Sequence, residues 1–394
     1  GKYVNLFLTP ENNNPWKIPP GVIGSPILYL STEHIDRRRP KDTEMNFDKE
    51  ALNSLGSTVK GILDTHKRDR QTLEIQWLKN LRQYQGKYDP DVLNRIPLTR
   101  SRSYPRDTRI KVKGGVAKMM EMMFPSQERN YAVTPSPNPS IPAADLERIL
   151  AETEQAGLMG EQASDTIERA IVELAKNRAT KMENEIADQL SDAGVDYPQL
   201  CKRVVRSGYL YGFGVAYFPQ VRTQSVRSWV MNKQTGVYEA KTESIRRPNP
   251  VYVRVWDSFP DLTAKQWDDQ EFFFERVVLM RSDLRNLAKR QDFISENIIE
   301  YLKTHTDGNY TAQSYEAELN SIAGTSNIAN RNTRRYELYR GVGFISGAQL
   351  DAVGMEIPED KLIDDIFVEC WLIDDQLIKL DEASFGDKVS DQYH

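Results

Sequence analysis

The sequence predicts an α+β protein in which helices and antiparallel strands occupy separate stretches of the chain. Long polar segments carry apolar residues at helical spacing, which is typical of amphipathic helices. Two alternating segments flank Gly236, as in an antiparallel hairpin. The mean hydropathy of −0.60 is low for a compact enzyme. We therefore expect an elongated or multimeric chain whose surface is partly covered by neighbouring copies.

The composition argues against several classes of protein. With 394 residues, the chain is long enough for about two or three domains. Its formal net charge of −5 argues against a protein that wraps DNA by neutralising phosphates, although DNA could still slide past an acidic surface. Cys201 and Cys370 form no CxxC pair and the histidines show no ligand spacing, so we expect no disulfide framework, metal or cofactor.

No signal peptide and no apolar run of membrane-spanning length are visible in the sequence. The chain begins at Gly1 without a methionine, and we expect a fragment or a part of a longer product.

Residues 1–54 are rich in asparagine, proline and charge, and no helical or strand period persists in them. We expect an extended arm that is ordered by contact with a partner. The triplet Arg37–Arg39 could touch phosphate, but three charges are more typical of a solvated tail. From Ser57 the spacing predicts an amphipathic helix that ends at Gln85, where Gly86 suits a left-handed cap.

A basic segment follows at 97–113. It carries Arg100, Arg102, Arg106, Arg109, Lys111 and Lys113. One interpretation is a phosphate-binding strip, but Tyr104 is its only aromatic residue, which is little for stacking on nucleotide bases. The acidic net charge favours the other interpretation, in which these side chains pair with acidic helices of this chain or of a neighbour. A methionine-rich helix at 114–124 then supplies an adaptable apolar face for core or interface packing.

Prolines in 131–142 predict an extended linker, and a long charged helical region follows at 143–192 with a break near 157–160. A further helix is expected at 197–210, and it leads into a turn with the glycines Gly208, Gly212 and Gly214. A phosphate-binding loop would place its glycines after a strand and before a helix. Here the helix comes first, so helix capping and a tight turn explain the glycines.

The centre of the chain predicts an antiparallel sheet over 215–279. Its strands are expected at 216–230, 236–245, 251–256 and 272–279. The third strand closes on a turn that contains Trp256, Asp257, Phe259, Pro260 and Asp261. Trp256 and Phe259 should anchor this turn in a core. The two aspartates could bind a metal, but aspartates commonly form turns without an ion.

The C-terminal part of the chain predicts shorter elements. We expect a helix from about 283 to 303 with an interruption at 292–293, a short helix at 314–323, a strand at 334–339, a charged excursion at 341–365, and a hairpin of 367–373 with 376–380. The tail at 381–394 is expected to have no structure of its own.

Four of these stretches occur in an informative order. They are the helix leading to Trp77–Asp89, Phe124–Asn130 with the proline-rich segment after it, the helix to Gly208 with Tyr211–Val215, and the turn Val255–Asp261 with Phe272–Arg276 and the helix after it. In this order they resemble the portal protein, or head-to-tail connector, of short-tailed double-stranded DNA bacteriophages. The resemblance covers about residues 55–380, and the order of the motifs makes it specific, because each motif alone is weak.

The resemblance implies an elongated subunit of a ring, normally of twelve copies, at one vertex of a capsid. It implies a helical wing with a central antiparallel sheet at 55–276, a stem helix at 277–306 and a small α/β clip at 307–380. Residues 1–54 would be an arm and 381–394 a tail. The return stem helix, crown and barrel of this family would lie beyond the tail.

The resemblance also implies partners and a mechanism. The ring would contact the major capsid protein, the terminase packaging motor and a tail adaptor protein, in the virion and, during assembly, in the host cytoplasm. Double-stranded DNA would pass through the channel during packaging and ejection. No membrane and no catalytic residues are expected, because no Ser/His/Asp set or pair of apolar-site carboxylates is visible.

Two alternatives remain open. A scaffold or internal ejection protein would show long repetitive helices without a central sheet. A nucleic-acid-processing enzyme would need a Walker loop or a carboxylate cluster at metal-binding spacing, and neither is visible in the sequence.

Overall fold

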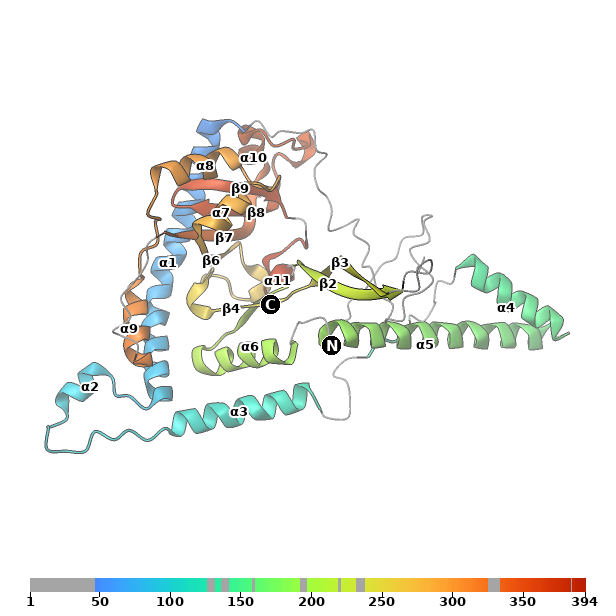
Figure 1. Ribbon diagram of the computed structural model, residues 1–394, viewed down its shortest axis with the longest axis horizontal. Coiled ribbons are helices and arrows are strands. Elements are labelled where there is room, and N and C mark those ends of the chain that lie inside the picture. Colours follow the sequence, from blue (N-terminus) through green and yellow to red (C-terminus); the bar gives the residue numbers. More distant parts are fainter. Residues whose placement is uncertain are drawn as a thin grey trace. The chain divides into compact units, whose positions relative to one another are not determined.

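The computed structural model describes residues 47–125, 132–135, 142–157, 160–191, 197–218, 221–231, 238–324, 334–383 and 385–394 (Figure 1). Helices and antiparallel strands both contribute, in agreement with the predicted α+β class. The chain divides into two compact units. The smaller unit contains helices α4 and α5, and the larger unit contains the other helices and the strands.

The smaller unit is a pair of helices, α4 (Ala143–Gln155) and α5 (Glu161–Ser191). Gly157 and Gly160 between them both have a φ of 68°, a conformation that glycine adopts without strain. This turn confirms the predicted break near 157–160. A hydrogen bond of 2.5 Å from the Arg178 guanidinium to the Asp145 carboxylate ties the two helices together.

The larger unit contains the following elements. Its helices are α1 (Lys49–Gln85), α2 (Pro90–Arg95), α3 (Asp107–Met123), α6 (Tyr197–Tyr211), α7 (Arg281–Leu287), α8 (Ser295–Thr304), α9 (Ser314–Ala323), α10 (Gly347–Val353) and α11 (Val389–Gln392). Its strands are β1 (Val215–Tyr217), β2 (Val221–Met231), β3 (Tyr238–Pro248), β4 (Val251–Val253), β5 (Ser258–Pro260), β6 (Phe272–Met280), β7 (Arg335–Ser346), β8 (Asp365–Ile373) and β9 (Gln376–Glu382). Short 3-10 turns lie at Val255–Asp257, Trp267–Asp269 and Glu359–Lys361.

Helix α1 begins earlier than the sequence predicts. The Asp48 carboxylate accepts hydrogen bonds from the backbone N–H groups of Glu50 and Ala51, which caps the first turn. The helix ends as predicted before Gly86, whose φ is 73°. The extended arm predicted over 1–54 is therefore wrong at its C-terminal end, because Leu52 is a buried core residue of α1. The rest of that arm, including Arg37–Arg39, lies outside the described residues.

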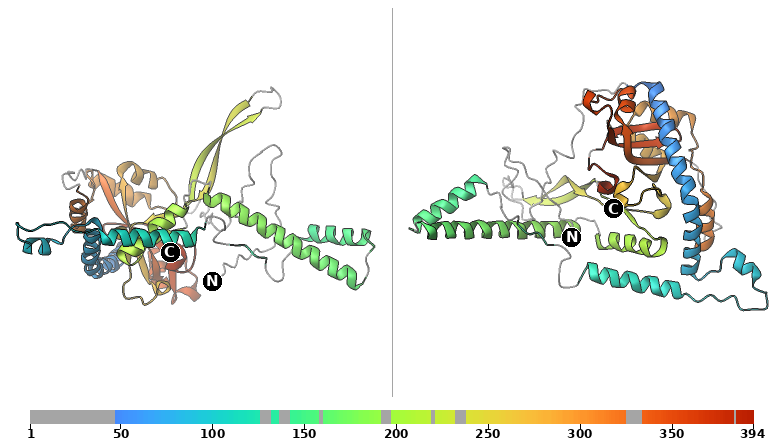
Figure 2. Two further views of the ribbon diagram at one scale, coloured as in Figure 1. Left: turned by 90° about the horizontal axis from the view of Figure 1, so that it is seen from below. Right: turned by 180° about the vertical axis from the view of Figure 1, so that it is seen from behind.

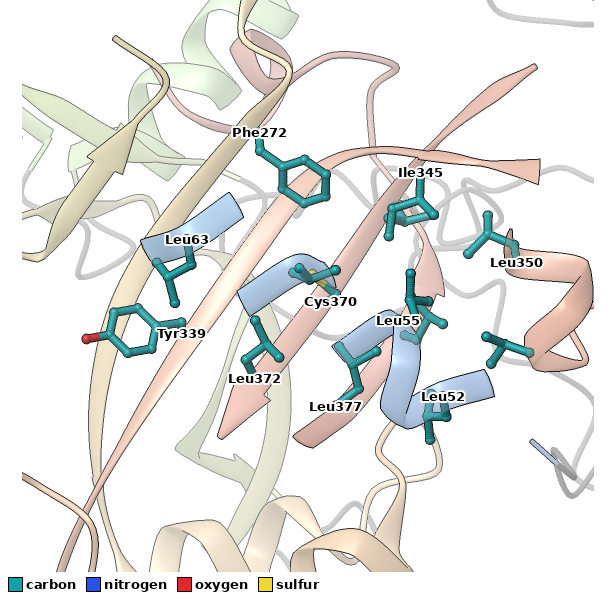
Figure 3. Close-up of a cluster of buried hydrophobic side chains, with 14 of the residues drawn as sticks. Leu52, Leu55, Leu63, Phe272, Tyr339, Ile345, Leu350, Cys370, Leu372 and Leu377 are labelled. Atoms are coloured by element: carbon teal, nitrogen blue, oxygen red, sulfur yellow. The ribbon is translucent and has the colours of Figure 1, made fainter. Parts of the chain in front are cut away.

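A five-stranded antiparallel sheet forms the centre of the larger unit, in the order β5-β6-β7-β8-β9. Its side chains alternate between the two faces. On one face, Leu52, Leu55 and Leu63 of α1 and Leu350 of α10 pack on Phe272, Tyr339, Ile345, Cys370, Leu372 and Leu377 (Figure 3). All of these side chains are buried, so this layer is a main source of hydrophobic stabilisation.

Two groups of elements cover the opposite face. From α7 and α8, the side chains of Leu284, Ile298 and Leu302 pack on Tyr336, Leu338, Ile373 and Ile378. From β1, β4, α11 and the residue after α11, the side chains of Val215, Val253, Val389 and Tyr393 pack on Phe273, Val342 and Phe367. Figure 1 shows α7 and α8 on one side of the strands, and the view from behind in Figure 2 shows α1 on the other.

This sheet crosses the boundaries that the resemblance implied. Strand β6 of the expected wing pairs along its length with β7 of the expected clip, and Phe272 lies opposite Gly343. The single sheet predicted over 215–279 is wrong, since β1–β4 and β2–β3 form two separate two-stranded sheets and β5–β6 belong to the five-stranded sheet. Residues assigned to the wing and to the clip thus share one hydrophobic core.

The stem helix expected at 277–306 is also wrong. Strand β6 continues to Met280, and the two short helices α7 and α8 follow it. Their apolar stripe, which produced the helical spacing in the sequence, packs on the sheet. The spacing was correct, but it indicated a helix pair against a sheet and not one long free helix.

Smaller differences have local causes. The strand predicted at 251–256 ends at Val253, because a 3-10 turn at Val255–Asp257 interrupts it. The charged excursion at 341–365 contains the end of β7 and α10. The helix predicted at 314–323 and the hairpin of 367–373 with 376–380 are confirmed as α9 and as β8 with β9.

The hairpin predicted around Gly236 is confirmed as β2 and β3, which pair from Val221 opposite Pro248 to Met231 opposite Tyr238. The expected turn at 232–236 lies outside the described residues. Figure 2 shows that the hairpin extends away from the five-stranded sheet, and neither strand pairs with a third strand in the described part of the chain.

The prediction that 381–394 has no structure is wrong. Helix α11 forms there, and the ring of Tyr393 is fully buried with its centroid 4.2 Å from that of Phe273 and 4.9 Å from that of Tyr217. The last residue, His394, exchanges backbone hydrogen bonds with Ala216 of β1. The apolar residues of the tail are too few to show a period, and their order comes from tertiary packing. Among the described helices, none is long and apolar enough to cross a membrane.

Replacing Tyr393 with phenylalanine should lower the free energy of unfolding by about 1 kcal/mol, because the partly buried Glu275 carboxylate would lose one hydrogen-bond donor and keep its ion pair with Arg340. The Tyr393 hydroxyl donates to Glu275 Oε2 over 2.9 Å, while the ring itself would be retained. Urea denaturation of the two proteins measures this difference. An unchanged midpoint would show that the hydroxyl contributes nothing and that only the ring anchors the tail.

Candidate functional site

Three of the four stretches that carry the resemblance meet at one aromatic cluster. Trp77 of α1 lies 5.3 Å from Trp256 and 6.0 Å from Tyr211 between ring centroids, in edge-to-face geometry. The Trp77 indole N–H donates to the Tyr211 carbonyl over 3.1 Å, and Tyr315 of α9 stacks on Trp256 at 4.9 Å. Such pairs contribute about 0.5–1.5 kcal/mol each beyond their buried area. The motifs are thus joined in space, and their first role is to hold the larger unit together.

The turn after this cluster is fixed by a buried arginine. Arg70 of α1 donates to the carbonyls of Trp256 and Ser258, and its guanidinium lies 3.7 Å over the Phe259 ring. Pro260 ends β5, and the Asp261 carboxylate accepts hydrogen bonds from the backbone and hydroxyl of Thr263. Phe259 is a core residue as predicted, and Asp261 acts as a turn former.

Asp257 belongs to a buried ionic network that the sequence did not reveal. Arg276 of β6 lies 2.6 Å from Glu316, 3.2 Å from Glu337 and 3.8 Å from Asp257. Burial raises the pKa of Asp257, and Arg254 and Arg276 oppose this rise. Burial alone would lower the pKa of Arg276, but the surrounding acidic groups outweigh it and the net shift is upward. The network joins β6, β7 and α9 through one buried arginine that faces three carboxylates.

A polar pocket of about 180 Å³ lies beside this network, and Lys67, Glu337, Tyr339 and Asp374 are among its lining residues. The Tyr339 hydroxyl donates to Glu337, and Asn309 donates to Asp374 over 3.0 Å. Burial lowers the pKa of Lys67, whose ammonium lies 4.0 Å over the Tyr339 ring. The acidic oxygens that line the pocket therefore already accept hydrogen bonds within the chain, which fits a structural role.

The three glycines of the predicted turn, Gly208, Gly212 and Gly214, have different structural roles. Gly208 lies inside α6, and Gly212 follows the helix with a φ of 93°, which only glycine adopts readily. Gly214 approaches the backbone of α6 so closely that a Cβ on it would lie 2.3 Å from the Val204 carbonyl oxygen. This geometry agrees with the prediction of a capped helix and a tight turn.

Two alanine substitutions at these glycines should have opposite effects. Gly214→Ala should destabilise the protein by about 1–3 kcal/mol, because the Val204 backbone would have to move. Gly208→Ala is the matched control: a Cβ there meets no atom within 4 Å, so the better helix former should stabilise the protein by about 0.5–1 kcal/mol. Thermal denaturation of both variants tests this, and equal shifts would refute the assigned close approach.

The predicted basic residues divide between a loop and a helix. Arg100 and Arg102 are exposed in the loop between α2 and α3, where Arg102 donates to the Ile96 carbonyl. Arg106 precedes α3, which begins at Asp107, earlier than the helix predicted from 114. The remaining residues Arg109, Lys111 and Lys113 lie on α3. The ion pairs formed by the described residues include none from these six side chains to an acid.

Part of this segment converges on Tyr84 at the C-terminal end of α1. Arg109 of α3 and Arg206 of α6 lie 5.8 Å and 5.4 Å from the centroid of the Tyr84 ring. The Arg106 side chain lies against Gly86, which ends α1. A helix C-terminus and an aromatic face both attract cations, which explains in structural terms why arginines lie here. We call Arg106, Arg109, Lys113 and Arg206 the basic surface, with Lys113 one helical turn beyond Arg109.

Charge reversal tests whether the basic surface also binds phosphate. For Arg109→Glu with Arg206→Glu, the slope of log affinity for duplex DNA against log salt should become shallower by about 2, because two phosphate contacts are lost. Lys111→Glu with Lys118→Glu makes the same change of net charge on the other flank of α3 and should alter the slope less. Fluorescence anisotropy over a salt series measures both. Equal effects would indicate that only net charge matters.

The sequence prediction missed Tyr84, Arg70 and Arg276, which are polar or aromatic residues without a motif. Lys202, Arg203 and Arg206 lie close together in the sequence of α6, but only the fold places Arg206 beside Arg109. The proline-rich stretch after Phe124 lies largely outside the described residues. A comparison with models of known protein families finds no match, and neither does a comparison with curated proteins. The function proposed for the chain therefore rests on its own residues and geometry.

Proposed function

We propose that the chain is a subunit of a portal ring, through which double-stranded DNA enters and leaves a phage capsid. The observation that carries this proposal is the order of the four resembling stretches, three of which pack together at the Trp77 cluster. Residues that match in sequence order and also contact one another are better support than motifs scattered over the fold.

Two surfaces support assembly with other chains. The end of the β2–β3 hairpin exposes Trp229, Val230, Met231 and Tyr238. An isolated two-stranded hairpin is marginally stable in water, and clustered exposed apolar residues mark contact sites. The basic surface, which has no acidic partner among the described residues, is available to a neighbouring subunit, the capsid or DNA.

The proposed mechanism is mechanical and electrostatic and involves no bond chemistry. A ring with net negative charge would repel phosphate and let DNA slide through its channel. The capsid protein, the packaging motor and a tail adaptor would contact the ring in the virion and, during assembly, in the host cytoplasm. The proposal assigns no channel residues to 277–306, because α7 and α8 are short and pack on the sheet through Leu284, Ile298 and Leu302.

The five-stranded sheet favours this proposal over the scaffold or ejection protein, for which we expected long helices without a central sheet. An enzyme that processes nucleic acid has no comparable observation in its favour, and the chain is proposed to be non-enzymatic.

Negative-stain imaging of the purified chain, combined with native mass spectrometry, tests the proposal. We expect closed rings with a central hole wide enough for a DNA duplex, and a mass near twelve subunits. A monomer at all concentrations, or an open filament, would contradict it.

A further inference from the structure

An open groove of about 750 Å³ runs between α7 and α8 on the outside of the larger unit. Its apolar part includes Ala288, Ile299 and Leu302, and the side chain of Ile299 is 47% exposed. The groove is separate from the Trp77 cluster and from the basic surface, and nothing in the ring proposal depends on it.

Four cations line this groove and no acid does. Arg281, Arg285 and Lys289 follow one another at intervals of four residues, and Lys303 lies one helical turn beyond Ile299 on α8. Arg281 donates to the carbonyls of Leu302 and Thr306 and so joins α7 to the end of α8.

The three remaining cations have no carboxylate partner among the described residues. The Lys289 ammonium donates to the Asn286 amide oxygen, and no ion pair among the described residues involves Arg285 or Lys303. The nearby Asp283 carboxylate accepts the Met280 N–H, and Asp292 pairs with Arg290 and Lys379. The positive charge at the groove is thus uncompensated.

We propose that this groove binds an acidic amphipathic helix of a partner protein. Aliphatic side chains on the floor fit leucine-like residues, which recur at i, i+3, i+4 and i+7 on such a helix. Arg281 and Arg285 lie one helical turn apart on α7, about 6 Å along its axis, and Lys289 follows in the turn after the helix, so glutamates one turn apart can face the two arginines. The lining contains no aromatic ring for nucleotide bases to stack on, which disfavours single-stranded nucleic acid.

A synthetic peptide probes this site directly. The probe is a fluorescein-labelled helix of about five turns with leucines on one face and glutamates on both flanks. Fluorescence anisotropy with the full chain should show saturable binding that weakens as salt is raised. Two control peptides separate the contributions: lysines replace the glutamates in one, and alanines replace the leucines in the other. Neither should bind appreciably.

Protein variants locate the binding. Arg285→Glu with Lys289→Glu should weaken binding of the probe at least about tenfold, and Ile299→Ser about threefold or more. Lys265→Glu, an exposed cation outside the groove, is the matched control and should leave binding unchanged. These side chains are exposed, so the thermal midpoints should stay close to that of the parent protein.

Several results would overturn the proposal. If the lysine peptide bound as well as the probe, the cations of the groove would not be selecting an acidic partner. If the alanine peptide bound as well, the apolar side chains of the groove would not contribute to binding. Unchanged affinity in the double variant would place the probe elsewhere. A groove used by a second copy of this chain would appear as a concentration-dependent mass that the double variant abolishes, while the peptide does not bind.

Discussion

Replacement of Arg276 with methionine should lower the free energy of unfolding by about 3–5 kcal/mol, the range found when one partner of a buried ion pair is removed. The Arg276 side chain is 2% exposed and compensates Asp257, Glu316 and Glu337 at once. Methionine retains much of the apolar stem but leaves three carboxylates close together, of which only Asp257 keeps a neighbouring cation, the exposed Arg254. The loss should therefore far exceed that of an ordinary surface salt bridge.

The matched control removes a different arginine from the same carboxylate. Arg254 lies 3.6 Å from Asp257, but its side chain is 62% exposed. Arg254→Met should therefore cost no more than about 1 kcal/mol. Urea denaturation followed by circular dichroism compares the two variants. Similar losses for both would show that burial of the network is not what makes Arg276 important.

The same network gives the variant a characteristic pH dependence. Burial already raises the pKa of Asp257, and Arg276 works against this rise. Without Arg276, the pKa of Asp257 in the folded state should rise further above its unfolded value. A carboxyl with a raised folded pKa favours folding increasingly as the pH falls through that pKa toward the unfolded value near 4. The loss of unfolding free energy in Arg276→Met, relative to the parent protein, should thus become smaller as the pH is lowered from about 7 to about 5.

Arg276 illustrates what the sequence could not predict. Arg276 lies on β6 and its acidic neighbours come from β7, α9 and the turn after β4, so no local spacing connects them. The same holds for Arg340, which pairs with Glu275 on the next strand and lies 3.6 Å over the Tyr217 ring. Buried ion pairs of this kind follow from the register of the strands, which a single sequence does not specify.

Local signals were predicted well because their causes are local. The end of α1 at Gly86, the break near 157–160 and the β8–β9 hairpin each depend on turn residues a few positions apart. The pairing of strands that are far apart in the sequence was predicted poorly. The strand predicted at 272–279 is confirmed as β6, but its partner β7 lies more than 50 residues later, and this pairing was not predicted.

The candidate site shows the same division. The sequence identified the basic residues of 97–113, yet it could not show that Tyr84 brings Arg109 and Arg206 together from two helices. It identified Trp256 and Phe259 as anchors because large aromatic residues next to a proline turn are seldom left exposed. Their contacts, Trp77 and Arg70, are supplied by α1, which lies far away in the sequence.

Polar substitution at the end of the β2–β3 hairpin should abolish ring assembly under the proposed function. Met231 lies opposite Tyr238 and Trp229 opposite Ala240, so Trp229, Met231 and Tyr238 share one face of the hairpin. Trp229 and Tyr238 are 66% and 62% exposed. A ring contact that buries both would lose its aromatic anchors in Trp229→Thr with Tyr238→Thr, and threonine retains the preference for a strand.

The fold of each subunit should survive this change, because the hairpin pairs with no other described strand and lies apart from the three clusters on the five-stranded sheet. Val230→Thr on the opposite face of the hairpin is the control and should leave assembly intact. Sedimentation velocity of the three proteins measures the outcome: we expect rings for the parent and for Val230→Thr, and monomers for the double variant. Rings in the double variant would show that the hairpin is not a subunit contact. Monomers in all three would instead count against the ring itself.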